Sequence, residues 1–217
     1  MRFFICLLTG LMTLVGQARE EILKDKQGMD CRLLLPSRIN PNTTYQIIVG
    51  APGLGGNSKG LAINDWVKRG DLMVLLPQFE TRGARPFQNG DGIHAEKLID
   101  LFTQVQSRYR VRDKLFIHGF SAGAQFAHRF TMYHPELVCG VSAHSAGSWA
   151  TDGFGIISPQ ANTIPFAISC GEQDTHKAFP SAKFTRLQWF HRFREEIDRQ
   201  DFPYLAKTWP DSGHAMT

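Results

Sequence analysis

Residues Gly119–Gly123 have the pattern G-x-S-x-G, with Ser121 at its centre. A short apolar run at 115–117 precedes them, and residues 124–130 are good helix formers with apolar side chains at helical spacing. A serine between a buried strand and a helix can stand on a tight turn, with the free N–H groups of the helix start beside it. The glycines suit such a turn because side chains there would collide with the neighbouring strand or helix. Because a plain strand-to-helix turn can have the same pattern, partners elsewhere in the chain must decide its role.

A serine hydroxyl becomes a strong nucleophile only when a base removes its proton and a third group holds that base. Asp174 comes in a G-x-x-D turn after the apolar run 164–169, and His214 follows the last such run, at 204–208. The order serine, acid, histidine is one of the orders known for such triads. We therefore predict that Ser121, Asp174 and His214 form a catalytic triad.

Each partner has an alternative interpretation. Asp174 can be a turn or helix-capping residue, and Glu172 or Asp152 can serve as the acid instead. The chain has eight histidines, so a single histidine is weak evidence. His176 is too close to Asp174 along the chain to be the expected base. The remaining histidines are better explained as helix-surface, core or strand-end residues: His94, His118, His128, His134, His144 and His191.

The negative oxygen that forms when a carbonyl is attacked needs hydrogen-bond donors that are already in place. The backbone N–H of Ala122, next to the serine, is the first predicted donor, and that of Leu54, in the glycine-rich loop 50–57, is the second. This loop lacks the G-x-x-x-x-G-K-[ST] pattern of a phosphate-binding loop and the full dinucleotide pattern. Phe120 and Trp149 are candidates for the substrate surface, although a core position is equally expected for Phe120.

The order of apolar runs and helix-like segments predicts the fold. Continuously apolar runs alternate with segments of helical periodicity, which is typical of a mostly parallel sheet with helices on both faces. We therefore predict a single three-layer α/β domain over 19–217. The expected strands are 31–36, 45–49, 72–76, 115–117, 138–143, 164–169 and 204–208; the expected helices start at 57 or 58, 93, 124 and 179.

The first 18 residues have the features of a secretory signal peptide. Arg2 gives a positive start, residues 3–15 are almost wholly apolar, and Gly16 and Ala18 are small residues at the cleavage positions. The apolar run is too short for a membrane span. We therefore expect a secreted or periplasmic protein without stable membrane association after cleavage.

The mature chain has three cysteines, Cys31, Cys139 and Cys170. Cys139 is expected to open one strand and Cys170 to close another, about 15–20 Å apart at roughly 3.3 Å per residue. A disulfide needs Cα atoms within about 7 Å. We therefore expect all three cysteines to be buried thiols.

The formal net charge of +4 is small, and the basic residues are scattered apart from four between 108 and 114. No aromatic interleaving or recognisable module accompanies them, so nucleic-acid binding is not expected. The spacing of histidines and cysteines likewise gives no metal motif.

The four motifs together resemble the α/β-hydrolase superfamily. Residues 51–57 are similar to its HG-x-GG loop, and the blocks 119–128, 133–143 and 146–149 are similar to secreted esterases of the polyhydroxybutyrate depolymerase and feruloyl esterase type. This resemblance implies a serine hydrolase that cleaves small or polymeric carboxylic esters without a cofactor. A secreted serine peptidase of the same fold and an inactive hydrolase-fold binding protein are the alternatives.

The sequence departs from this family pattern at two places. Pro52 stands where the loop usually has histidine, which is expected to alter the site for the negative oxygen. The family normally adds a final helix after the catalytic histidine, whereas the sequence stops at Thr217. A missing helix would leave the His214 loop poorly supported, so we expect either a truncated sequence or a weak enzyme.

Overall fold

The computed structural model describes residues 18–55, 61–79, 87–151 and 155–216. The predicted signal peptide therefore lies outside the described residues, except for Ala18. Eight strands form a single sheet in the order β1-β2-β4-β3-β5-β6-β7-β8. The strands are β1 (Arg19–Lys24), β2 (Asp30–Leu35), β3 (Gln46–Ala51), β4 (Leu72–Pro77), β5 (Leu115–Phe120), β6 (Val138–His144), β7 (Phe166–Gly171) and β8 (Tyr204–Trp209).

Most of this sheet is parallel. β1 pairs with β2, and β2 with β4, in antiparallel fashion. All other neighbours, from β4 through β3, β5, β6 and β7 to β8, run parallel. Parallel strands present their carboxyl ends at the same edge of a sheet, so the loops that follow β3, β5, β7 and β8 meet at one edge, where ligands bind in open α/β sheets.

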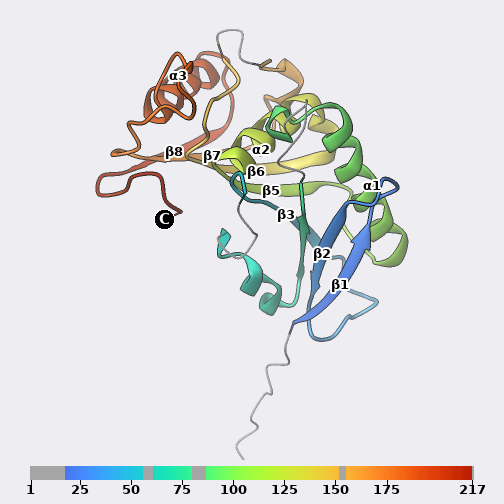
Figure 1. Ribbon diagram of the computed structural model, residues 1–217. Helices are drawn as coiled ribbons and strands as arrows, with labels where there is room; N and C mark the ends of the chain where they lie inside the picture. The colour runs from blue at the N-terminus through green and yellow to red at the C-terminus, as the bar shows by residue number, and fades with distance from the viewer. Residues whose placement is uncertain (1–17, 56–60, 80–86, 152–154, 217) are drawn as a thin grey trace, which may run out of the picture.

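Helices cover both faces of the sheet, as predicted, but very unequally (Figure 1). The larger core cluster joins one face of the sheet to α1 (Gly92–Arg108), α2 (Ala122–Tyr133) and α3 (Arg186–Arg199). The smaller cluster joins the other face to the 3-10 helix η2 (Asn64–Arg69). The remaining 3-10 helices are η3 (Phe87–Asn89), η4 (Pro135–Leu137) and η5 (Pro159–Ala161). The result is a three-layer α/β fold.

The sequence explains where the last long helix begins. The Thr185 side chain accepts a hydrogen bond from the Gln188 N–H, and the Gln188 side chain accepts one from the Thr185 N–H. This reciprocal pair satisfies backbone donors that a helix start otherwise leaves without partners. α3 then buries Trp189, Phe190 and Phe193 against the sheet. The expected start at 179 was therefore six or seven residues early.

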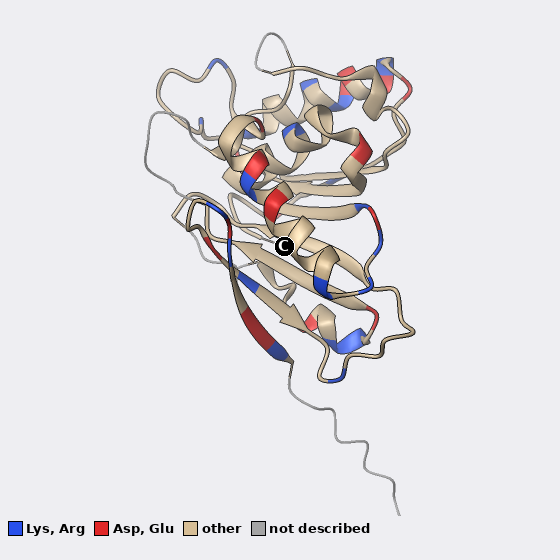
Figure 2. Cartoon of the chain, turned by 90° about the vertical axis from the view of Figure 1, so that its right-hand side faces the viewer, with Lys and Arg blue, Asp and Glu red and all other residues tan. Residues whose placement is uncertain are grey.

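Three other expectations about the fold were wrong. The polar segment 19–24, for which no strand was expected, forms strand β1, whose mixed charges are visible along the sheet edge in Figure 2. An edge strand tolerates such charges because they face water. Only the 3-10 turns of η2 are found before Gly70, where an ordinary helix was expected; residues 57–60 of that helix lie outside the described part. Cys139 is exposed, whereas Cys31 and Cys170 are buried as expected, and all three are free thiols.

Candidate active site

Ser121 stands on a sharp turn between β5 and α2. Its backbone angles, φ 54° and ψ −114°, lie in a region that non-glycine residues rarely adopt. The Ser121 N–H donates to the His144 carbonyl at 2.9 Å, and the Ser121 carbonyl accepts from the Gln125 N–H at 3.1 Å. These backbone hydrogen bonds hold the turn at both ends.

Two glycines make this turn possible, as the sequence predicted. A Cβ on Gly119 would lie 2.3 Å from the Gly123 carbonyl oxygen, and a Cβ on Gly123 would lie 1.8 Å from the Ala51 carbonyl oxygen. Neither distance is compatible with a side chain. The start of α2 therefore packs directly on the backbone of β5 and of β3.

The three predicted triad residues meet in one chain of hydrogen bonds. His214 Nε2 lies 2.9 Å from Ser121 Oγ, and His214 Nδ1 lies 2.8 Å from Asp174 Oδ2. Because a carboxylate can only accept, Nδ1 carries the proton and Nε2 is left as the acceptor for the serine hydroxyl. This is the arrangement in which a histidine can remove the proton of a serine.

Asp174, the carboxyl group in this chain of hydrogen bonds, is completely buried. Asp174 has no exposed surface, and its second oxygen, Oδ1, lies 3.5 Å from Arg186 Nη1. Its backbone N–H donates to the Gly171 carbonyl at the end of β7. The alternative acid Glu172 is exposed and instead accepts a hydrogen bond from Thr208 Oγ1. Asp152, the other alternative, lies outside the described residues.

A large pocket of about 650 Å³ opens beside the serine. Both predicted oxyanion donors, Ala122 and Leu54, line it together with Ser121. A Cβ on Gly53 would lie 3.4 Å from Ser121 Cβ, so the backbone of the loop after β3 lies directly against Ser121. Leu54 is 59% exposed and lines the pocket.

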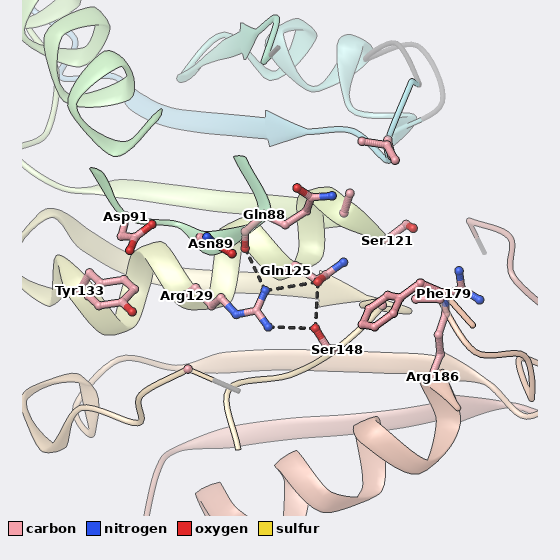
Figure 3. A pocket seen from close by; sticks show the side chains of 15 residues that line it. Gln88, Asn89, Asp91, Ser121, Gln125, Arg129, Tyr133, Ser148, Phe179 and Arg186 are labelled. Carbon is pink, nitrogen blue, oxygen red and sulfur yellow. Dashed lines mark hydrogen bonds between the residues drawn. The ribbon is translucent and has the colours of Figure 1, made fainter. Parts of the chain in front are cut away.

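The pocket wall has a polar cluster that was not predicted (Figure 3). Arg129 donates hydrogen bonds to the Gln88 carbonyl, to Gln125 Oε1 and to Ser148 Oγ. Burial lowers the pKa of Arg129 to about 10. A sequence signal did exist, since Ser121, Gln125, Arg129 and Tyr133 follow each other at intervals of four and therefore share one face of α2. All four line the pocket.

The structure does not place Trp149 or Phe120 among the residues that line this pocket. Trp149 has no exposed surface and stacks on Phe193 with 4.8 Å between ring centroids, so its prediction as a substrate-binding residue is wrong. Phe120 stacks on His214 with centroids 4.9 Å apart and on His144 with centroids 5.8 Å apart. Phe120, the last residue of β5, points to the sheet face opposite α2. Its ring therefore lies against His214 and His144 and not in the pocket.

The His214 loop is tied to the acid loop rather than poorly supported. The Gln173 N–H donates to the Ser212 carbonyl at 2.9 Å, and the Gln173 side chain donates to the Pro210 carbonyl at 3.3 Å. A Cβ on Gly171 would lie 2.2 Å from the Ser212 carbonyl oxygen, so the two loops are in backbone contact. The end of β7 thus supports both Asp174 and His214.

Metal-binding clusters are absent from the described residues. Within 18–55, 61–79, 87–151 and 155–216, no group of three histidine, cysteine or acidic side chains is placed to hold a metal ion. In the same ranges, no helix has the length and apolarity needed to cross a membrane.

The comparisons with known proteins give similarity at the level of structure only. No family model matches the sequence, and no curated protein matches it. Poly(aspartic acid) hydrolase-1 from Sphingomonas sp. KT-1 superimposes with a TM-score of 0.72 at 20% identity, over 92% of this chain and 94% of that one.

Two esterase structures are similar to a comparable degree. A poly(3-hydroxybutyrate) depolymerase from Bordetella parapertussis has a TM-score of 0.69 at 17% identity, over 92% of this chain and 85% of that one. A ferulic acid esterase from Anaeromyces mucronatus, solved with ferulic acid, has a TM-score of 0.66 at 18% identity, over 91% of this chain and 84% of that one. Together with the strand order and the serine turn, these similarities show that the chain has the α/β-hydrolase fold.

Proposed function

We propose that this protein is a serine hydrolase that cleaves carboxylic esters. The observation that carries the proposal is the continuous hydrogen-bond chain from buried Asp174 through His214 to Ser121, which ends in the wall of a 650 Å³ pocket. A chain of this kind has one evident chemical use, which is to make the serine oxygen nucleophilic at neutral pH.

The reaction follows in two halves from this geometry. Ser121 Oγ attacks the ester carbonyl carbon while His214 Nε2 takes the hydroxyl proton, and Asp174 stabilises the imidazolium that results. His214 then gives the proton to the departing alcohol oxygen as the C–O bond breaks, leaving an acyl group on Ser121. A water molecule attacks this acyl group with His214 again as the base, which releases the acid and restores the serine.

The negative oxygen of both intermediates is held by backbone donors. The Ala122 N–H stands at the free end of α2, and the Leu54 N–H belongs to the loop that packs against Ser121. Preorganised N–H groups at such a position typically contribute a factor of about 10² to 10³ in rate each. Pro52 precedes this loop turn without removing either donor, since only its own nitrogen lacks a proton.

Ester substrates are favoured by the structural relatives and by the pocket. A poly(3-hydroxybutyrate) depolymerase and a ferulic acid esterase share the fold, and both names denote enzymes of ester bonds. The pocket is large enough for a bulky acyl or alcohol group, within the range of about 300–1,000 Å³ usual for small-molecule sites.

A second candidate function is cleavage of amide bonds in an acidic polymer. The observation that favours it is the charge of the pocket lining, where two arginines, Arg129 and Arg186, stand beside one carboxylate, Asp91. A poly(aspartic acid) hydrolase is among the proteins of similar structure. The triad itself does not distinguish esters from amides.

The test is hydrolysis of p-nitrophenyl acetate, butyrate and octanoate by residues 19–217, in parallel with Ser121→Ala and His214→Ala. Wild-type turnover that falls at least about 10³-fold in both variants supports the proposal. Turnover that survives in Ser121→Ala contradicts it. Release of aspartate oligomers from poly(aspartic acid), with negligible ester turnover, favours the second candidate, and a folded protein inactive on both favours the binding-protein alternative.

We also propose that the protein is exported and that residues 1–18 are removed. The proposal rests on the apolar run 3–15 and on the small residues before Arg19, which opens strand β1. N-terminal sequencing of protein recovered from the periplasm or the medium tests it. A mature chain that starts at Arg19 is expected, and an intact Met1 on cytosolic protein contradicts export.

A further inference from the structure

His144 is the last residue of β6 and lies beside the nucleophile turn. In the register of the sheet it is the partner of Phe120, the residue before Ser121. Only 4% of its surface is exposed. Its ring stacks on Phe120, which also stacks on His214. His144 therefore lies one ring away from the base of the triad without lining the substrate pocket.

Both ring nitrogens of His144 have partners, and these partners define its protonation state. Nε2 lies 2.8 Å from the Ala215 carbonyl oxygen and 3.4 Å from Ser145 Oγ, which can accept from it as well, and Nδ1 lies 2.7 Å from Ser169 Oγ. A carbonyl oxygen can only accept, so Nε2 carries the proton. The Ser169 hydroxyl can then donate to Nδ1. Burial lowers the pKa of His144, which agrees with a neutral ring.

The bond to Ala215 acts on the residue that immediately follows His214. Fixing the Ala215 carbonyl fixes the peptide on the far side of the catalytic base, whereas the bond from Gln173 to Ser212 fixes the chain two residues before it. The His214 side chain is 32% exposed, so its surroundings restrain it only in part. Holding the backbone on both sides is therefore a direct way to keep Nε2 within 2.9 Å of Ser121.

We propose that His144 is a positioning residue for the catalytic base: its neutral ring, held in the Nε2–H form by Ser169, binds the Ala215 carbonyl and keeps the His214 loop closed on the serine. The kinetic part of this proposal rests on the proposed hydrolase function. The structural part, the hold on residues 213–216, does not.

The neighbouring strand carries a matched pair that lacks this connection. His118 on β5 is the register partner of Ser142 on β6, and its Nδ1 lies 3.1 Å from Ser142 Oγ. In the same way, His144 on β6 is the register partner of Ser169 on β7 and is close to its hydroxyl. Nε2 of His118 is buried without a hydrogen-bond partner among the described residues. His118 therefore has the same chemistry and a similar setting, but among the described residues it makes no hydrogen bond to the His214 loop.

The experiment compares His144→Phe, His144→Gln and His118→Phe. Phenylalanine keeps an aromatic ring on Phe120 but has no donor, whereas the glutamine amide can donate from about the place of Nε2. The two readouts are kcat and KM for p-nitrophenyl butyrate and the hydrogen–deuterium exchange of backbone amides in 210–216. Circular dichroism and the thermal midpoint check that each variant is folded.

We expect His144→Phe to lower kcat by about 10- to 100-fold with KM within a factor of about two, because the base is misplaced while the pocket is intact. Exchange in 210–216 is expected to speed up by a similar factor. His144→Gln should recover most of both losses, and His118→Phe should resemble the wild type in both.

Two results would overturn the proposal: exchange and kcat of His144→Phe equal to those of His118→Phe, or no recovery in His144→Gln. If His144→Phe does not fold, Ser169→Ala replaces it, with a smaller loss in the same direction expected and no change overturning the proposal. If the wild type hydrolyses no ester, the proposed function fails, and the exchange comparison still decides whether His144 holds the loop.

Discussion

The serine and the histidine of the site are held by different kinds of contact. On the serine side, glycines at 119 and 123 bring backbones so close that no Cβ fits, and the turn adopts angles with a positive φ. On the histidine side, Gly171 makes a similar backbone contact with Ser212, but the rest of the loop is held by separate hydrogen bonds. His214 donates to Asp174, Gln173 donates to the Ser212 and Pro210 carbonyls, and His144 donates to the Ala215 carbonyl. Ser121 is thus held by the packing of strand and helix, whereas His214 is held by hydrogen bonds around one backbone contact.

This difference predicts two different ways for the site to fail. Close packing of backbones is part of the folded core, so a change there costs stability before it changes the chemistry. A hydrogen bond on a loop can be lost while the fold persists, so a change there costs rate. Variants on the two sides should therefore separate into unstable proteins and stable, slow enzymes.

The largest effect is expected for Asp174→Asn on the histidine side. The amide can donate to Nδ1, which favours the wrong tautomer of His214, and kcat for p-nitrophenyl butyrate should fall by about 10⁴-fold. Urea unfolding should show that the fold is retained. Glu172→Gln is the matched control, since that exposed carboxylate lies two residues away and bonds Thr208. Equal losses in both variants would contradict the assignment of the acid.

The next effect is expected for Gly123→Ala on the serine side. The new Cβ would lie 1.8 Å from the Ala51 carbonyl oxygen, and this clash cannot be relieved without a shift of α2 away from β3. We expect the free energy of unfolding, measured in urea, to fall by about 3 kcal/mol or more. At Gly213, on the histidine side, a new Cβ has its nearest neighbour at 3.9 Å, and Gly213→Ala should cost less than about 1 kcal/mol. Similar losses in both variants would remove the contrast between the two sides.

The smallest effect is expected for His118, which lies on the same sheet face as His144 but lacks the hydrogen bond that His144 makes with Ala215. Burial first, and the charge of His144 second, lower the pKa of His118 to about 4. In the unfolded chain the pKa is about 6.5, so below that pH the unfolded state binds a proton that the folded state does not. Stability should therefore fall as the pH drops from about 6.5 to 4, by at most about 3 kcal/mol from this group.

Urea unfolding of the wild type and of His118→Phe at several pH values measures this contribution. The variant should lose part of the pH dependence between about 6.5 and 4, whereas its kcat should stay near that of the wild type. An unchanged pH dependence of stability would show that His118 does not titrate as the structure implies.

The parts of the site that follow from strand ends were predictable from the sequence. Ser121, Asp174 and His214 each follow an apolar run, and parallel strands bring their carboxyl ends together, so order along the chain was enough to place them. Leu54 and Ala122 were located by the same reasoning, and both line the pocket.

What the sequence could not supply was the direction of individual side chains. Trp149 follows the end of β6 and is next in sequence to Ser148, which lines the pocket. Its own side chain nevertheless points into the core, against Phe193. Arg129 is a different case: its spacing from Ser121 was enough to put it on the pocket face of α2, but it was counted only as a helix former. The role of His144 depends on contact with Ala215, 71 residues away, which no local pattern encodes.

The most direct test of the central claim is the mass of the protein after reaction with a fluorophosphonate. The activated serine predicted here attacks phosphorus and expels fluoride, which leaves one covalent adduct per chain. Peptide mapping should place that adduct on Ser121 in the wild type, and labelling should be lost in Ser121→Ala and strongly slowed in His214→Ala. An adduct on another residue, or labelling of the wild type no faster than that of His214→Ala, would contradict the account.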